Sequence, residues 1–451
     1  MPTYREYADR RTALLTQIQA QGGGVAILAT SAEMTRNSDC FFPFRHDSFF
    51  YYLTGFTEPE AILVLIAGSS NQSILFCREK NLEREIWDGF RYGPDAACIE
   101  FGMDAAYPIE TLESNLPTWF SDAATLFHTQ GYNSHLDTQL TRSIATVRSK
   151  ARSGVMPPQR TQDLHGIINE MRLIKDSSEI ALMQRAADIS AVAHQRAMRI
   201  TRAGMFEYEL EAELLHEFRR QGAQAPAYGS IVASGANACV LHYSANNAKI
   251  NAGDLILIDA GCEFDSYASD ITRTFPASGK FSAPQQALYE IVLAAQSAAL
   301  EHAVVGARYI DGHHAAVRVL TQGMLDTGLL NSNLVGSVDD AIASNAFRQF
   351  YMHGTGHWLG LDVHDVGNYR VTDSGNSVDS GAEKPYRQLQ AGMAITIEPG
   401  MYVRPAAGVP EQFWNIGIRI EDDIIISAQG PINLSRNTPK SVADIEALMR
   451  R

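Results

Sequence analysis

AGDLILIDAG at residues 252–261 has a second copy in the chain, AGMAITIEPG at residues 391–400. Each copy reads Ala-Gly, an apolar run, an acid, one further residue and Gly. A short apolar run between glycines is typical of a buried strand, so each copy places a carboxylate, Asp259 or Glu398, where a buried strand ends. An ionised carboxylate is costly there unless a positive charge meets it. Further acids follow both copies, and the simplest common partner is a pair of metal ions.

The bulk properties limit the classes of function. A chain of 451 residues favours two domains, and an apolar fraction of 45% supports a globular protein. The net charge of -14, without long runs of like charge, argues against nucleic acid or an anionic membrane as partner. Neither a signal peptide nor an apolar stretch long enough to span a bilayer is apparent, so we expect a cytoplasmic protein.

The cysteines point to the same compartment. Five of them occur without CxxC spacing, which favours a reducing environment and thiols that serve as small core residues. Cys262 lies close to Asp259 in sequence, but the hard carboxylates around it favour a core thiol over a metal ligand.

Two domains of different class are expected. Strand-like runs at residues 25–29, 61–66 and 73–76 alternate with helical stretches, which predicts an α/β domain over residues 1–160. Pro157-Pro158 marks the best linker candidate, followed by a linker helix region at 161–175 and a catalytic domain at 176–451.

The second domain reads as a duplicated α+β fold with pseudo-twofold symmetry. A capping box at residues 176–179 opens a helix to about 200, and a second helix is expected at 207–220. Strands are predicted at 254–260, 268–275, 393–403 and 416–426. Each half runs from helices, through a His-bearing segment, to a strand that ends in an acid and a second strand that carries another acid.

Spacing brings several polar side chains together. Asp259 and Asp270 flank a segment of hairpin length, which would place both carboxylates side by side. In residues 415–421 the isoleucines alternate with Arg419 and Glu421, so period two puts these two polar residues on one face. The Gly-rich segment 352–360 adds two histidines, and glycines allow a backbone to approach a ligand closely.

Six motifs in fixed order carry a resemblance to a known family. They are IDAG at 258–261, SDITRTF at 269–275, HGTGH at 353–357, VHD at 363–365, EPG at 398–400 and RIED at 419–422. With them the chain resembles the pita-bread metallopeptidases and, within that group, the aminopeptidase P family over nearly its whole length. The stretch from Thr372 to Glu383 is longer than usual for the family and is expected to lengthen a surface loop.

The resemblance implies the residues of a dimetal site and its surroundings. The implied metal ligands are Asp259, Asp270, His357, Glu398 and Glu421. The implied catalytic residues are Glu398, His364, His353, His242 and Arg419. The substrate-binding candidates are Trp87, which matches a position that in similar enzymes helps line a neighbouring subunit's active site, together with Tyr402 and Arg152.

Charge and ligand chemistry agree with that site. Four converging carboxylates would repel one another, whereas two divalent ions balance them and a shared hydroxide leaves a small negative excess that suits a substrate's ammonium group. Oxygen donors favour manganese, with cobalt, magnesium or zinc as alternatives. We expect a metal-bridging water to attack the scissile carbonyl, Glu398 to accept its proton, and His364 to stabilise the developing charge. His242 and His353 would shape the leaving-group side.

The expected function is therefore that of a Xaa-Pro aminopeptidase, acting on peptides with proline second and forming a homo-oligomer, a dimer or a tetramer. Two alternatives stay open. One is a Xaa-Pro dipeptidase with the same metals, and the other is a pita-bread binding protein without catalysis, which would be expected to have lost ligands.

Other conspicuous residues have ordinary interpretations. Asp422 and Asp423 are interpreted as solvated loop acids, and the aromatic run at 41–52 as core or as a subunit interface. The histidines left as structural or surface residues are His46, His302, His313 and His314.

Overall fold

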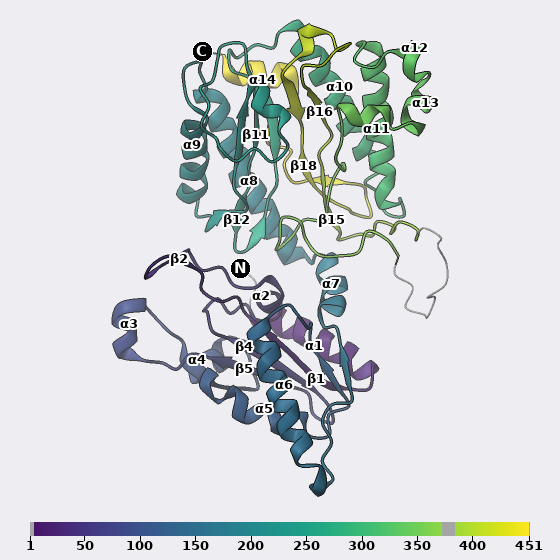
Figure 1. Cartoon of the computed structure of the whole chain (residues 1–451). Helices are drawn as coiled ribbons and strands as arrows, with labels where there is room; N and C mark the ends of the chain where they lie inside the picture. Colours follow the sequence, from purple (N-terminus) through teal and green to yellow (C-terminus); the bar gives the residue numbers. More distant parts are fainter. Residues whose placement is uncertain (1–3, 372–383, 451) are drawn as a thin grey trace. The chain divides into compact units, whose positions relative to one another are not determined.

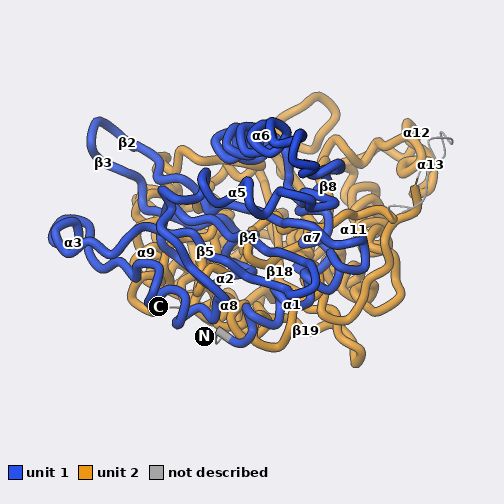
Figure 2. The backbone as a smooth tube through the Cα atoms, turned by 90° about the horizontal axis from the view of Figure 1, so that it is seen from below, with its two compact units in different colours: residues 1–172 blue, residues 173–451 orange. Residues whose placement is uncertain are grey.

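The computed structural model describes residues 4–371 and 384–450, so the expected loop at 372–383 lies outside the described residues. The chain divides into two compact units, residues 1–172 and 173–451 (Figure 2). Residues 153–158 lead into a strand of the first unit's sheet, and the division falls after Arg172.

A mixed six-stranded sheet organises the first unit, in the order β6-β5-β4-β1-β7-β8. Its buried apolar runs form the predicted central strands, with β1 antiparallel to β4 and parallel to β7. The strands are β1 (Gly24–Ala29), β4 (Ile62–Ala67), β5 (Gln72–Cys77), β6 (Ala105–Pro108), β7 (Thr125–Phe127) and β8 (Arg160–Gln162). A small hairpin pairs β2 (Thr35–Asn37) with β3 (Cys40–Phe41). The helices are α1 (Tyr4–Ala20), α2 (Ser48–Thr54), α3 (Leu82–Asp88), α4 (Gly93–Glu100), α5 (Leu112–Phe120), α6 (Ser134–Ser149) and α7 (His165–Leu173).

The aromatic run divides between core and surface. Phe49 to Tyr52 lie in α2 and are buried, as a core interpretation requires. Asp47 caps this helix by accepting a hydrogen bond from the Phe50 amide. The core interpretation is wrong for Phe41 and Phe42, which are 54% and 49% exposed because the β2–β3 hairpin lies outside the main sheet.

His46 makes the stability of the first unit depend on pH. Its ring is buried and stacks on Tyr51 with centroids 4.2 Å apart, and burial, reinforced by the charge of Arg45, lowers the pKa of His46 to about 3. Below pH 6.5 the unfolded chain takes up a proton that the folded chain does not, so stability falls as the pH falls. Between pH 7 and pH 5, His46 should lower the free energy of unfolding by about 2 kcal/mol, and we expect His46→Phe to abolish this loss. The measurement is urea unfolding of both proteins at both pH values. Equal losses in both proteins would contradict this.

The described part of the second unit has four long helices, of which the first two are those predicted at 176–200 and 207–220. They are α8 (Ser177–Ile200), α9 (Glu207–Arg220), α10 (Ala283–Leu300) and α11 (Tyr309–Asp326). The predicted capping box is confirmed, because Asp176 accepts from the Glu179 amide while the Glu179 side chain accepts from the Asp176 amide. Figure 1 shows α8 and α9 beside the strands of the first half, and α10 and α11 beside those of the second. Shorter helices are α12 (Ser332–Val335), α13 (Val338–Ala343) and α14 (Val442–Met449).

Three of the predicted strands break where they carry an acid. The expected strands at 268–275, 393–403 and 416–426 are each two strands, interrupted around Asp270, Glu398 and Glu421. Pro399 supplies one cause, because it has no N–H to donate to a ladder. The interruptions release the acid-bearing residues from strand pairing. The strands in these regions are β13 (Tyr267–Ala268), β14 (Thr272–Pro276), β15 (Ala394–Ile397), β16 (Gly400–Val403), β17 (Ile416–Arg419) and β18 (Asp422–Ile425).

Asp259 and Asp270 approach each other through β11 (Leu255–Asp259), which pairs antiparallel with β14 so that Asp259 lies opposite Thr272. The segment between them is no simple loop, because β12 (Cys262–Phe264) pairs with β13 inside it. Gly261 is required at this corner, since an added Cβ would lie 1.7 Å from the carbonyl oxygen of Ser269. The remaining strands are β9 (Ala225–Pro226), β10 (Ile231–Ser234) and β19 (Ile432–Asn433).

Strand β14 joins the two halves. The hydroxyl of Thr274 donates to the Arg419 carbonyl at 3.0 Å, and the Glu421 amide donates to the Thr272 carbonyl at 3.1 Å. These bonds bring acids of the first half beside acids of the second. Among the residues described, no helix has the length and apolar character needed to cross a membrane.

Candidate metal centre

A cavity of about 790 Å³ in the second unit gathers the predicted site residues. Both halves contribute to its wall, together with the Gly-rich segment at 353–357. All five implied metal ligands line it: Asp259, Asp270, His357, Glu398 and Glu421. So do four of the implied catalytic or supporting residues: His242, His353, His364 and Arg419.

The ligand-type atoms converge within metal-binding distance. One ligand atom each from Asp270, His357 and Glu421 lies within 4.8 Å of the other two. Glu398 reaches the same place, with Oε1 3.9 Å from His357 Nε2. On the other side, the Tyr228 hydroxyl donates to Asp259 Oδ1 at 2.5 Å and also to Asp270. Asp270, His357 and Glu421 thus form the closest group, with Glu398 beside His357 and Asp259 linked to Asp270 through Tyr228.

Burial and mutual repulsion disturb the protonation of these acids. Burial raises the pKa of Glu398 to about 7, and burial with the neighbouring carboxylates raises that of Glu421 well above its ordinary value. The pKa of Asp270 is lowered, because the imidazole of His357 outweighs the effect of burial. A divalent cation would relieve the repulsion between these acids and favour the ionised form of Glu398 and Glu421.

The donor set fits divalent metal ions. His357 donates from Nδ1 to the Trp358 carbonyl at 2.9 Å, which leaves Nε2 facing the acids as a ligand atom. Thr272 donates from its hydroxyl to Glu421 Oε2 at 2.6 Å and so orients that carboxylate. Carboxylate oxygens with one imidazole are ligands typical of manganese, magnesium or cobalt. The thiol of Cys262 donates to the Ala186 carbonyl at 3.4 Å, as a core thiol does, and is not one of these ligands.

Arg419 and Tyr402 connect the acids to His353. Arg419 is buried and donates to Asp259, to the Thr272 hydroxyl at 3.2 Å and to the Tyr402 hydroxyl at 3.1 Å. Tyr402 in turn lies 2.8 Å from His353 Nε2. Because Tyr402 is only 1% exposed, its hydroxyl acts on the site by holding His353 and Arg419 in place.

His364 and His242 complete the polar wall. The ring of His364 stacks on His357 with centroids 4.0 Å apart. A buried ion pair follows it directly, in which Lys175 Nζ lies 2.8 Å from Asp365 Oδ2. His242 comes from the first half of the second unit and lines the same cavity.

Two of the implied substrate-binding residues belong to the first unit. Trp87 lies in α3 and is 80% exposed, beside the exposed side chains of Leu82 and Ile86 on the same helix. Arg152 lies in an exposed 3-10 turn. Neither is among the residues that line the cavity.

Several residues of the site were not predicted. Tyr228 bridges two acids, yet nothing in its neighbourhood distinguishes it in the sequence. Glu207 was expected only as part of a helix, but it is fully buried and accepts hydrogen bonds from the amides of Ser234 and Ala248 and from the Tyr243 hydroxyl. Glu207 thereby supports the segment that carries His242.

The interpretation of Asp422 and Asp423 as solvated loop acids is wrong. Both are 1% exposed. Asp422 pairs with Arg273 at 2.7 Å and with Lys440 at 2.5 Å, and these cations outweigh burial and lower the pKa of Asp422 to about 2. Asp423 accepts from the Asp270 amide at 3.1 Å, next to a predicted ligand. Both acids therefore stabilise the backbone around the site.

Family comparison agrees with this geometry. Residues 181–428 match the model of metallopeptidase family M24, and residues 7–127 match that of the aminopeptidase P N-terminal domain. The chain belongs to metallopeptidase family M24. Its first unit carries the α/β fold and its second the pita-bread fold that the sequence predicts.

Individual relatives extend the match over the whole chain. The chain is 43% identical to a Xaa-Pro aminopeptidase of Escherichia coli, covering 99% of this chain and 97% of that one. It is 44% identical to a Xaa-Pro aminopeptidase of Haemophilus influenzae, covering 98% and 97%. Among solved structures, an aminopeptidase of Pseudomonas aeruginosa superposes with a TM-score of 0.94 at 47% identity, covering 100% of this chain and 98% of that one. A variant of Escherichia coli aminopeptidase P in complex with substrate gives 0.93 at 42% identity, covering 99% and 98%.

Proposed function

We propose that this protein is a Xaa-Pro aminopeptidase that removes the first residue of peptides with proline at the second position. One observation carries the proposal: four acids and a histidine from both halves of the second unit line one cavity, large enough to admit a peptide end. Relatives named Xaa-Pro aminopeptidase, similar over their full length, support the same activity.

The site residues divide the chemistry among them. Asp259, Asp270, His357, Glu398 and Glu421 would hold two divalent ions, which supply Lewis-acid activation of water and of the substrate carbonyl when bound. Glu398 accepts the proton of the attacking water at its carboxylate, which lines the cavity. His364 stabilises the negative charge that develops on the carbonyl oxygen.

Recognition of the substrate follows from charge and shape. The acids keep a small excess of negative charge that attracts the ammonium group of the first residue. His242 and His353 flank the leaving side, and Arg419 holds Asp259 and Tyr402 in place. A proline nitrogen has no hydrogen to donate, so a site for the Xaa-Pro bond recognises the ring without that donor.

The remaining features of the proposal concern metal, assembly and location. Manganese is proposed as the physiological metal because the donors are mostly carboxylate oxygens, with cobalt, magnesium or zinc as substitutes. A homo-oligomer, a dimer or a tetramer, is proposed because α3 exposes Leu82, Ile86 and Trp87, which are 72%, 81% and 80% exposed. A cytoplasmic location is proposed from the cysteine usage. Residues 1–160 are proposed as the N-terminal domain, 161–175 as the linker helix region and 176–451 as the catalytic domain.

A comparison of two peptides tests the activity. Protein purified without chelator is analysed for metal and then supplied with Mn²⁺, and its cleavage of a Xaa-Pro-Xaa tripeptide is compared with that of a Xaa-Pro dipeptide. We expect two metal ions per chain and faster cleavage of the tripeptide. Cleavage of the dipeptide alone would establish the dipeptidase instead, and absence of metal and of cleavage would favour a binding protein.

Trp87 offers a test of the role of a second subunit. We expect Trp87→Ala to weaken peptide cleavage, seen as a lower kcat/KM, and to leave the metal content unchanged, because a residue so exposed on its own chain can act on substrate from a neighbour's surface. Met34→Ala is the matched control, since Met34 is also exposed, at 69%. Unchanged cleavage by the Trp87 variant would remove this residue from the substrate site.

A further inference from the structure

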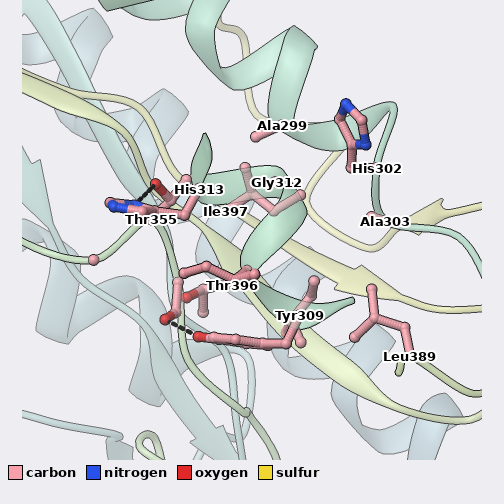
Figure 3. A pocket seen from close by; sticks show the side chains of 14 residues that line it. Ala299, His302, Ala303, Tyr309, Gly312, His313, Thr355, Leu389, Thr396 and Ile397 are labelled. Atoms are coloured by element: carbon pink, nitrogen blue, oxygen red, sulfur yellow. Dashed lines mark hydrogen bonds between the residues drawn. The ribbon is translucent and has the colours of Figure 1, made fainter. Parts of the chain in front are cut away.

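The segment of residues 354–356, here called the glycine loop, is a thin wall between two cavities. Gly354 and Gly356 line both the 790 Å³ cavity of the metal centre and a second cavity of about 130 Å³ behind it. Figure 3 shows the second cavity, bordered by Tyr309 and His313 of α11 and by Ala299 and Leu389. Part of the glycine loop thus has open space behind it, while Gly356 itself packs against the Thr396 carbonyl, where an added Cβ would lie 2.0 Å away.

Hydrogen bonds from α11 hold the glycine loop across this space. His313 Nδ1 lies 2.8 Å from the Thr355 hydroxyl (Figure 3). The Thr355 hydroxyl also bonds to the Tyr351 hydroxyl at 2.6 Å. One turn earlier on the same helix, the Tyr309 hydroxyl donates to the Gly356 carbonyl. Thr355 is 6% exposed, so its hydroxyl has little access to water as a substitute partner.

The glycine loop is connected directly to two implied metal ligands. His357 follows Gly356 in the chain, and the Glu398 amide donates to the Thr355 carbonyl at 2.8 Å. A displacement of the loop would therefore move both ligands together. Close-packed neighbours normally resist such a shift, but a cavity supplies no atoms to do so.

We propose that His313, assisted by Tyr309, is a positioning residue that fixes the glycine loop from behind and so sets the placement of His357 and Glu398 for metal binding. The inference rests on the proposed function, because it assumes that these two residues are ligands. It assigns a role to a histidine that the sequence suggests is merely structural. His313 touches neither metal nor substrate; it acts through Thr355.

Two substitutions at one position separate positioning from packing. In His313→Asn a polar atom stays near the place of Nδ1, whereas His313→Leu keeps the bulk and loses the hydrogen bond. We expect His313→Leu to bind Mn²⁺ about 10-fold or more weakly in calorimetry, as loss of a group that orients ligands does elsewhere, and His313→Asn to bind close to wild type. The Mn²⁺ electron paramagnetic resonance spectrum should change only in the Leu variant. His302→Leu is the control, because His302 lines the same cavity from its exposed side.

The outcomes are distinct. If His313 serves packing alone, the His313→Leu variant will bind Mn²⁺ at least as well as the His313→Asn variant, and the inference is overturned. Should His313→Leu fail to fold, Thr355→Val is compared with Tyr351→Phe by the same calorimetry, because the Thr355 hydroxyl bonds to both His313 and Tyr351. Unchanged affinity of Thr355→Val, or an equal loss in both variants, overturns the inference, and a loss confined to Thr355→Val supports it. Wild-type protein that binds no Mn²⁺ overturns the proposed function and the inference with it.

Discussion

Replacing Glu398 by Gln will reduce kcat for a Xaa-Pro-Xaa peptide by about 100-fold or more, the usual contribution of a positioned proton acceptor. The amide keeps the size of the side chain but cannot take up a proton. Glu398 is suited to that task by its place in the wall of the cavity, beside His357. The measurement is steady-state hydrolysis by protein reconstituted with Mn²⁺.

Metal analysis separates the two roles proposed for Glu398. A Gln variant that retains two metal ions and loses turnover isolates the proton transfer, whereas joint loss of metal and turnover indicates a ligand role as well. Glu411→Gln is the matched control, because Glu411 is exposed in a short turn and should behave as wild type. Unchanged turnover in the reconstituted Glu398 variant rules out its role as proton acceptor.

Replacing Arg273 by Met will lower the free energy of unfolding by about 3–5 kcal/mol, the usual cost of breaking a buried ion pair. Arg273 is 0% exposed and donates to Asp422 at 2.7 Å, to the Glu421 carbonyl at 2.6 Å and to the Thr438 carbonyl at 3.0 Å. Methionine fills part of the space and satisfies none of these acceptors. Because Glu421 loses a backbone partner, metal content should fall as well.

The control for Arg273 is a cation on the surface. Arg318 pairs with Asp339 at 2.6 Å, but their side chains are 61% and 77% exposed. Arg318→Met should therefore cost no more than about 1 kcal/mol. The comparison is made by urea unfolding at neutral pH. Equal midpoints for the two variants would show that the buried ion pair of Arg273 stabilises the fold no more than the exposed one of Arg318.

The sequence predicted the elements of the fold that depend on local pattern. The helix at 207–220 has the bounds expected from its periodicity, and the repeated strand pattern correctly marked Asp259 and Glu398 as acids at strand ends. The family resemblance then indicated Asp270, His357 and Glu421, which the structure brings to the same cavity. The sequence pattern was sufficient for these residues because neighbouring residues in the chain determine where a strand ends and where a Gly-rich loop forms.

The sequence could not indicate contacts that arise only from tertiary packing. The interruptions at Asp270 and Glu421 were missed because no Pro or Gly marks them in the sequence. Tyr228 meets its two acids only after β11 and β14 have paired. Glu207 looks like any acid in the first turn of a helix, and its burial depends on the chain folding back over it between residues 234 and 248.

The division of the acids between two halves has a consequence for biosynthesis. During translation Asp259 and Asp270 leave the ribosome long before Glu398 and Glu421, and β14 finds its partners in the second half only when those later residues have followed. An unfinished chain therefore has half a centre and no hydrolytic power.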